Sequence, residues 1–474
     1  MVRRYSIEDR ELKDLLVAAI KDFAVPGAQL GLLTDTGEGE SIRAQTVCAG
    51  SISTYTGYRV QPDTLFQIGS ISKIWTTVLA MQLVDEGLLD LDATVKEVLP
   101  EFAIHMAPDI TFNCTVRHLM NHTSGIEGDA FPDLGRDDDC VARYVRYLAD
   151  FPPRTPLGGP LSYSNGAFVI LGRIIEKLRG VTWDTALRRY IAKPAGLDHV
   201  WTLPEDVLRF SSALGHIRAV NAGQRLFPAP IEPSGVWQLP RCTGPCGSVS
   251  ASMKDLLSFV SIFLNHGVAP NGVRLLSDRS CSMMIRQSVD IRAQGVENLG
   301  WGLGWQLPNW GDTPAFGHGG ATEGQRAAVV VFPERRCAIG VLTNAYSGSA
   351  MAASLTADIA GRLGLGEHRT ATVDNRHIDE HEAGRVCGSY RRFNTEFSFA
   401  AQGPTGLQAV FEPDPDDGPY AARITLPVYP TAEGYYAVQF PGDRGVTELA
   451  FLPTGEGGMY AAMDHRITPR VEAA

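Results

Sequence analysis

Strand-like segments that lie far apart in the chain constrain its fold most. Residues 28–33 and 42–49 form one apolar pair, and residues 327–332 and 338–343 form another, with a short turn-prone stretch inside each pair. Helical patterns fill the long interval between the two pairs. The sequence therefore predicts a mixed α/β (α+β) body, whose antiparallel sheet combines strands from both ends of this region.

The helical patterns differ in how much of their surface is apolar. The segment 70–88 carries apolar residues on most sides and ends at Gly87, which is typical of a buried helix. The other segments with helical spacing are residues 7–24, 140–149, 166–179, 183–193, 251–266 and 350–363.

After residue 366 the pattern changes. Residues 367–383 are polar and charged and are interpreted as a linker. From there to the end, short alternating or aromatic-rich runs recur, separated by Gly, Pro and Asp. We therefore expect a first domain over 1–366, a linker over 367–383, and a small antiparallel β-barrel over 384–474.

The amino-acid composition limits the kinds of partner that the chain is expected to bind. The chain carries 42 basic and 53 acidic residues, a formal charge of −11, so neither nucleic acid nor an anionic membrane is expected as a partner. No apolar run near Met1 resembles a signal peptide and none is long enough to span a bilayer, which favours a cytoplasmic protein. The 8 cysteines are scattered, and only Cys242 and Cys246 lie close together, without a nearby histidine. No metal or cofactor is expected.

The first candidate for chemistry is the pair Ser70 and Lys73 at the start of the buried helix. A serine there lies near free backbone N–H groups and the positive end of the helix dipole. A lysine three residues later leaves the same face, and burial lowers its pKa toward that of a general base. The alternative is that Ser70 caps the helix while Lys73 extends to solvent.

The second candidate is Tyr163-Ser164-Asn165, which follows a turn-rich stretch and precedes the helix at 166. In an extended segment, residues two apart point the same way, so the phenol and the amide face one side together. A phenol can relay protons, and an amide can hold a lysine or a substrate carbonyl. The alternative is an asparagine cap beside a packed tyrosine.

The third candidate is the glycine-rich run around His318, residues 316–321, just before the second pair of strands. Gly319 and Gly320 would let a substrate backbone approach a strand edge and leave N–H groups for an oxyanion. His318 adds a titratable group on that edge. The alternative is a tight turn without a catalytic role.

Together these three segments resemble the serine β-lactamase and penicillin-binding protein superfamily. Tyr-Ser-Asn in place of S-D-N resembles its class C β-lactamase and D,D-peptidase branch. His-Gly-Gly in place of K-T-G is similar to family VIII-type esterases, D-aminopeptidases and acyltransferases, and it disfavours penicillin hydrolysis. The stretch 116–126 also resembles this branch, and the resemblance covers about residues 8–365. It implies a β-lactamase/transpeptidase-like fold, and the terminal barrel resembles the lipocalin-like barrels appended to some of these hydrolases.

The resemblance also implies roles for individual residues. Ser70 would be the nucleophile, Lys73 its base and Tyr163 the proton shuttle to the leaving group. Asn165 would bind Lys73 and the substrate amide, and His318 would replace the usual lysine. Backbone N–H groups of Ser70 and Ala321 would form the oxyanion hole. Five aromatic residues could line an acyl pocket, although buried aromatics usually belong to the core: Phe131, Trp237, Trp301, Trp305 and Trp310.

Three functions remain open at this point. The leading one is a serine hydrolase that acts on small-molecule esters, amides or D-amino-acid-containing peptides through acyl-Ser70. The second is a transacylase or cyclising thioesterase that passes the acyl group to an amine or alcohol in natural-product biosynthesis. The third is a non-catalytic binding module. The oligomeric state is left open.

Overall fold

The computed structural model describes residues 7–35, 42–218, 231–295, 299–393, 395–403, 406–412, 423–432, 434–440, 445–455 and 457–471. Its central sheet has 8 strands in the order β2-β1-β13-β12-β11-β10-β9-β8. The long strands are β1 (Gly27–Asp35), β2 (Ile42–Gly50), β11 (Phe316–Thr322), β12 (Gln325–Phe332) and β13 (Cys337–Thr343). The short strands are β8 (Val289–Asp290), β9 (Gly300–Trp301) and β10 (Gln306–Leu307).

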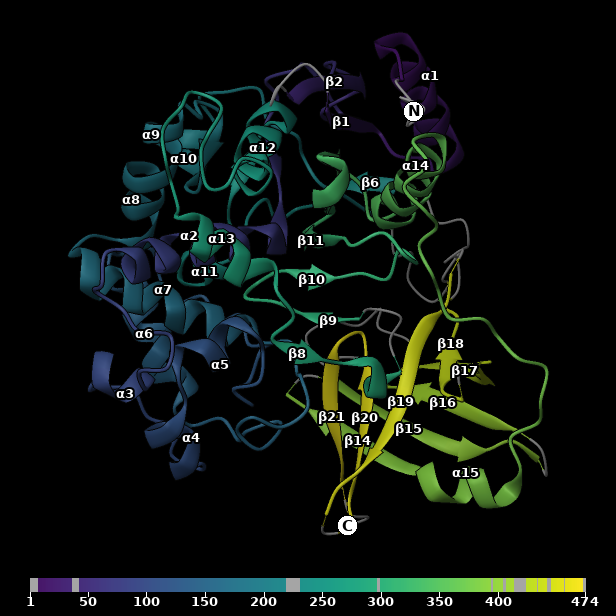
Figure 1. Cartoon of the computed structure of the whole chain (residues 1–474). Helices are drawn as coiled ribbons and strands as arrows, with labels where there is room; N and C mark the ends of the chain where they lie inside the picture. The colour runs from purple at the N-terminus through teal and green to yellow at the C-terminus, as the bar shows by residue number, and fades with distance from the viewer. Residues whose placement is uncertain are drawn as a thin grey trace.

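Strands from the two ends of this region meet in the sheet centre. β1 pairs antiparallel with β13, with Leu30 opposite Val341, which confirms the mixed antiparallel sheet predicted from sequence. Helices α1 (Asp9–Asp22) and α14 (Gly348–Arg362) share an apolar cluster with these strands (Figure 1). Helix α12 (Met253–Val260) packs on the other cluster. It packs closely because Gly31 has no Cβ, which would lie 2.6 Å from the Met253 sulfur.

The helical region surrounds α2 (Ser72–Asp85), in which every residue from Ser72 to Leu83 is buried. Trp75 stacks on Phe259 of α12 with ring centroids 3.7 Å apart. Side chains of this size each contribute about 1.5–3 kcal/mol when fully buried, so α2 is the centre of the main core. Helices α7 (Asn165–Arg179), α8 (Trp183–Leu187) and α11 (Gly244–Gly247) contact α2.

The remaining elements of this region are short, apart from α6 and α13. The helices are α3 (Val95–Val98), α4 (Pro108–Asn113), α5 (Val116–Met120), α6 (Cys140–Leu148), α9 (Lys193–Ala195), α10 (Pro204–Val207) and α13 (Asp278–Ile285). The strands are β3 (Phe66–Gln67), β4 (Val200–Trp201), β5 (His216–Arg218), β6 (Ile231–Pro233) and β7 (Ser250–Ala251). In the part of the chain that the structure describes, no helix has the length and apolar character needed to cross a membrane.

The C-terminal strands close into an 8-strand antiparallel barrel, as the alternating runs predicted (Figure 1). The strands are β14 (Gly388–Arg392), β15 (Thr395–Ala401), β16 (Leu407–Phe411), β17 (Ile424–Pro430), β18 (Tyr436–Val438), β19 (Thr447–Pro453), β20 (Met459–Met463) and β21 (Arg466–Val471). Tyr390, Phe397 and Phe399 are buried in its interior.

Part of the segment expected to be a linker has regular structure. Helix α15 (Glu380–Val386) begins within 367–383, and its Ala383 and Val386 pack in the barrel core together with Ile378. The helix has a sequence signal, because Asp379 caps it by accepting the Glu382 N–H at 2.7 Å. The division of the chain into domains at these boundaries remains a prediction.

Candidate active site

Ser70 lies in a 3-10 turn, η1 (Gly69–Ile71), directly before α2. Lys73, one turn later, is fully buried, and its Nζ lies 3.0 Å from Ser70 Oγ. The same Nζ donates to Asn165 Oδ1 at 2.6 Å and to the Cys246 carbonyl at 2.8 Å. The lysine therefore does not extend to solvent, and its amine is directed at the serine hydroxyl.

Burial controls the protonation of Lys73. Desolvation is the largest effect, and it lowers the pKa of Lys73 to about 7. Cys246 opposes this shift, whereas the positive charge of Arg466 adds to it. A lysine with this pKa is partly neutral near pH 7 and can accept a proton.

Tyr163 and Asn165 are both buried and face Lys73. The Lys73 Nζ lies 4.8 Å from the centroid of the Tyr163 ring. Burial raises the pKa of Tyr163 above its ordinary value, while the Ser70 hydroxyl and then the Arg466 charge act to lower it. Asn165 is the first residue of α7, and Ser164 caps that helix by accepting the Ala167 N–H at 3.0 Å. The helix cap is therefore Ser164, and its two neighbours in the chain, Tyr163 and Asn165, extend into the site.

Strand β11 approaches the Ser70 turn very closely. A Cβ on Gly69 would lie 2.4 Å from the Ala321 nitrogen, and a Cβ on Gly320 would lie 1.9 Å from the Ile68 carbonyl. Gly69 also has φ +52°, a backbone conformation that favours glycine. Only glycine at these two positions permits β11 to pack this closely on the Ser70 turn, with the Ala321 nitrogen against Gly69 and the Ser70 nitrogen against Gly320.

His318 lies on β11 and is buried, with its ring centroid 6.1 Å from that of Tyr163. Its Nδ1 lies 2.5 Å from the Gly319 carbonyl, which can only accept, so Nδ1 carries the proton. Burial, followed by the Lys73 charge, lowers the pKa of His318 to about 3. His318 is therefore neutral at physiological pH, unlike the lysine it replaces in the resemblance.

His122, which sequence analysis did not single out for the site, supports the tyrosine. Its ring stacks on Tyr163 at 4.4 Å between centroids, and its Nδ1 accepts the Ser164 N–H at 3.0 Å. It has a positive φ of 61°, which is rare outside glycine and indicates that its surroundings hold it there. The stretch 116–126 was the available signal, but a lone histidine carries no orientation in sequence.

The barrel contributes directly to this site. The turn between β20 and β21 carries His465, whose carbonyl accepts the Tyr163 N–H at 2.8 Å. Next to it, the Ile467 N–H donates to Ser162 Oγ at 3.3 Å. The His465 ring packs edge-on against Trp301 of β9, and Figure 1 shows the barrel beside β8 and β9. One of the five candidate aromatics, Trp301, thus lies at the site, while Trp305 and Trp310 belong to the cores.

A carboxylate anchors this turn of the barrel. Asp129 accepts from Arg466 Nε at 3.0 and 3.1 Å, and it also pairs with Arg392 of β14. The Arg466 guanidinium lies 5.1 Å from the Tyr163 ring centroid. Asp129 lies two residues after Glu127, which forms a buried ion pair with Arg154. The Glu127 carbonyl accepts a hydrogen bond from the Ser164 hydroxyl. Docking of the barrel is therefore connected to the placement of the tyrosine.

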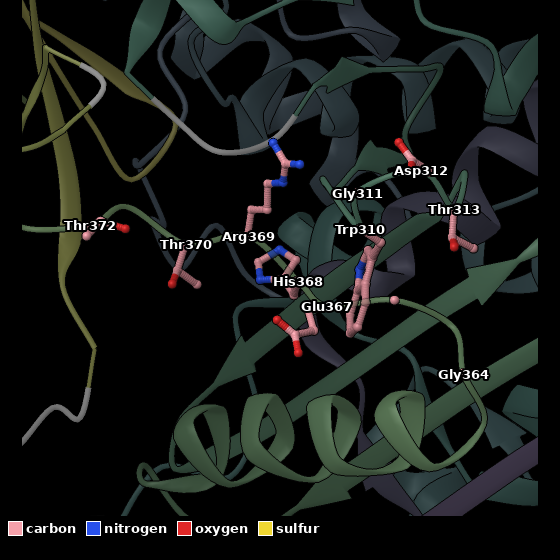
Figure 2. A pocket seen from close by; sticks show the side chains of 11 residues that line it. Trp310, Gly311, Asp312, Thr313, Gly364, Glu367, His368, Arg369, Thr370 and Thr372 are labelled. Atoms are coloured by element: carbon pink, nitrogen blue, oxygen red, sulfur yellow. The ribbon is translucent and has the colours of Figure 1, made fainter.

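A separate cavity of about 700 Å³ lies away from these residues. Figure 2 shows it between the loop at 310–313 and the segment 364–372, with His368 and Arg369 among its lining side chains. It is bordered by no residue of the Ser70 site, so it carries no part of the chemistry described above.

The eight residues predicted from sequence thus occupy one place in the fold. They are Ser70, Lys73, Tyr163, Asn165, His318, Gly319, Gly320 and Ala321. Among them, Gly319 faces away: a Cβ there would approach only the Ala327 carbonyl, at 3.9 Å.

The chain belongs to the β-lactamase family. Residues 18–362 match the family model described as Beta-lactamase. Penicillin-binding protein 4 of Amycolatopsis lactamdurans is 38% identical over 373 residues, which is 78% of this chain and 93% of that protein. The relatives are serine hydrolases, and the chain is accordingly an enzyme of the serine hydrolase type, built for acyl-enzyme chemistry.

Solved structures share the fold, and one of them does so over nearly the whole chain. The crystal structure of SurE covers 98% of this chain and 99% of its own at a TM-score of 0.76 and 22% identity, and SurE was also solved with D-Leu. D-amino acid amidase from Ochrobactrum anthropi SV3, in complex with L-phenylalanine amide, covers 70% of this chain and 91% of its own, with a TM-score of 0.57 and 20% identity. At these identities the likeness establishes the fold.

Proposed function

We propose that this enzyme hydrolyses small-molecule esters, amides or D-amino-acid-containing peptides through an acyl-Ser70 intermediate. The observation that carries the proposal is the fully buried Lys73 amine, 3.0 Å from the Ser70 hydroxyl and with a pKa of about 7. The substrate class also draws on the D-amino acid amidase of similar fold. A non-catalytic binding module does not explain a buried lysine directed at a serine.

In the first half-reaction, neutral Lys73 takes the Ser70 proton as Oγ attacks the substrate carbonyl. The N–H groups of Ser70 and Ala321 stabilise the resulting oxyanion. The C–O or C–N bond to the leaving group then breaks, and Tyr163 gives its proton to the departing oxygen or nitrogen and takes the one held by Lys73, which leaves Lys73 neutral again. Asn165 holds the Lys73 amine in line throughout, since its Oδ1 accepts from Nζ.

In the second half-reaction, a nucleophile enters from the side that the leaving group vacated. Water attacks the acyl carbonyl and gives its proton to the relay of Tyr163 and Lys73. The bond between the acyl carbon and Ser70 Oγ breaks, and the proton returns to Ser70. The products are a free acid and regenerated enzyme.

Covalent labelling tests this proposal. We expect a fluorophosphonate probe to add to the protein at Ser70, as read by intact mass and peptide mapping, and Ser70→Ala to abolish both labelling and p-nitrophenyl ester hydrolysis. Ser72→Ala is the matched control, because the Ser72 hydroxyl accepts the Val249 N–H at 3.0 Å and takes no part in the proposed chemistry. Full ester hydrolysis by Ser70→Ala would disprove the mechanism.

Transfer of the acyl group to an amine or alcohol, including cyclisation, is the second candidate. The observation that favours it is the contact of the barrel turn with Tyr163, the residue proposed to exchange protons with the leaving group and the second nucleophile. The structure of SurE with D-Leu offers a precedent for an amino acid bound to a protein of this fold. A cognate amine would then divert product from free acid to amide, and exclusive hydrolysis at saturating amine would exclude this candidate.

A cytoplasmic location is part of the proposal, and cell fractionation tests it. The expected result is that the protein and its activity appear in the cytoplasmic fraction.

A further inference from the structure

The position of His318 on strand β11 determines to which side its side chain points. Residues two apart on a strand point to the same side. A Cβ on Gly320 would face the Ile68 carbonyl and lie 3.3 Å from the Ser70 nitrogen, so the side of β11 that carries His318 faces the Ser70 turn. The His318 ring also lies 6.1 Å from Tyr163, between centroids, which places it beside the group proposed to serve the leaving group.

The second ring nitrogen of His318, Nε2, is a hydrogen-bond acceptor. The Gly319 carbonyl holds the proton on Nδ1, so neutral His318 presents a lone pair at Nε2. Within the residues that the structure describes, the buried Nε2 has no hydrogen-bond partner. A buried acceptor without a partner is unfavourable, and a donor on a bound ligand would relieve that cost.

We propose that His318 Nε2 accepts a hydrogen bond from the leaving group or the incoming nucleophile, and so selects groups that carry an N–H or O–H donor next to the reacting atom and rejects a free carboxylate there. The inference rests on the acyl-Ser70 chemistry proposed above. Two lone pairs facing each other repel, so a carboxylate at Nε2 is disfavoured. The cations Arg466 and Lys73 do not reverse this preference: Arg466 is paired with Asp129 and Asp464, and Lys73 is bound by Asn165 and the Cys246 carbonyl.

A comparison of three acyl acceptors tests the proposal. The acyl-enzyme is formed from a p-nitrophenyl ester, and D-alaninamide, D-alanine methyl ester and D-alanine are then offered in turn. All three acyl acceptors attack through the same amine. The group next to that amine is a hydrogen-bond donor in D-alaninamide, only a hydrogen-bond acceptor in D-alanine methyl ester, and a carboxylate in D-alanine. The rate of amide product formation is measured for the native enzyme and for His318→Phe. Comparing the ratios between the two proteins cancels the different reactivities of the three amines.

We expect the preference for the amide over the ester to be about tenfold greater in the native enzyme than in His318→Phe. His318→Lys should shift selection toward D-alanine by at least about tenfold, because an ammonium group favours a carboxylate. His266→Phe, a change at an exposed histidine outside the site, should leave all three ratios unchanged.

Two results would overturn the inference: ratios in His318→Phe equal to those of the native enzyme, or a native preference for D-alanine. Fluorophosphonate labelling of Ser70 in each variant shows that the site is folded. Absence of any acyl-enzyme would instead refute the proposed function, and this inference with it.

Discussion

The charge on the barrel turn should contribute to the pH at which the enzyme becomes active. If Lys73 is the base, only its neutral form supports acylation, so kcat/KM falls about tenfold per unit below its pKa and levels off above it. Burial places that pKa at about 7. Arg466 contributes to the depression, and Arg466→Met should therefore move the acid limb of the profile to higher pH.

The structure bounds the size of this shift. Lys73 Nζ lies 4.8 Å and Arg466 Cζ 5.1 Å from the same Tyr163 centroid, so the two charges are at most about 10 Å apart. At an effective dielectric constant of about 20, two unit charges at that distance repel by about 1.7 kcal/mol, or roughly one pH unit. Asp129 offsets part of the arginine charge. The expected shift is about half a unit to one unit upward.

Removing the opposing carboxylate provides the complementary test. Asp129→Asn leaves the charges of Arg466 and Arg392 without their shared partner, and should move the limb to lower pH. Arg466→Lys keeps the charge and should leave the limb close to that of the native enzyme. The assay is the pH dependence of kcat/KM on a p-nitrophenyl ester across the neutral range, with circular dichroism at each pH as a check of folding.

The directions of the shifts decide the interpretation. An upward shift in both Arg466→Met and Asp129→Asn would mean that a loosened barrel admits water to Lys73, and that hydration rather than charge sets the pKa. A native profile without an acid limb near pH 7 would refute the assignment of Lys73 as the base.

Three further outcomes follow from the packing of the site. Gly320→Ala should lower kcat about a hundredfold by displacing β11 from the oxyanion position, whereas Gly319→Ala, whose Cβ meets only the Ala327 carbonyl at 3.9 Å, should stay near native activity. His122→Phe should reduce the free energy of unfolding in urea by about 2 kcal/mol, because it strands a buried N–H and strains a positive φ, and His122→Asn should recover much of this loss. Arg154→Leu should destabilise the fold by about 3 kcal/mol, since it leaves Glu127 as a buried unpaired charge, and a melting temperature close to native would contradict this expectation.

Local sequence patterns predicted much of the secondary structure. The segments read as α1, α2, α7 and α14 all form helices, because each has apolar spacing and a capping or breaking residue at its end. Strands β14 and β21 have no clear strand pattern, since Gly388–Arg392 and Arg466–Val471 are rich in arginine and show little alternation. They are strands because each supplies the edge that the other needs to close the barrel.

For the site, spacing along the sequence determined which close neighbours in the chain point the same way, and the resemblance to the superfamily joined the three segments into one expected site. Ser70 and Lys73 share one helical face, and Tyr163 and Asn165 share one side of a short segment, because spacing along a helix or strand fixes direction. Only the tertiary structure decided the protonation states and the contact of the barrel turn with Tyr163. The Lys73 pKa depends on burial and on Arg466, nearly four hundred residues away in the chain, and the His318 tautomer depends on a backbone carbonyl. Backbone groups and distant charges leave no signature in sequence, because they act through space and become neighbours only once the chain has folded.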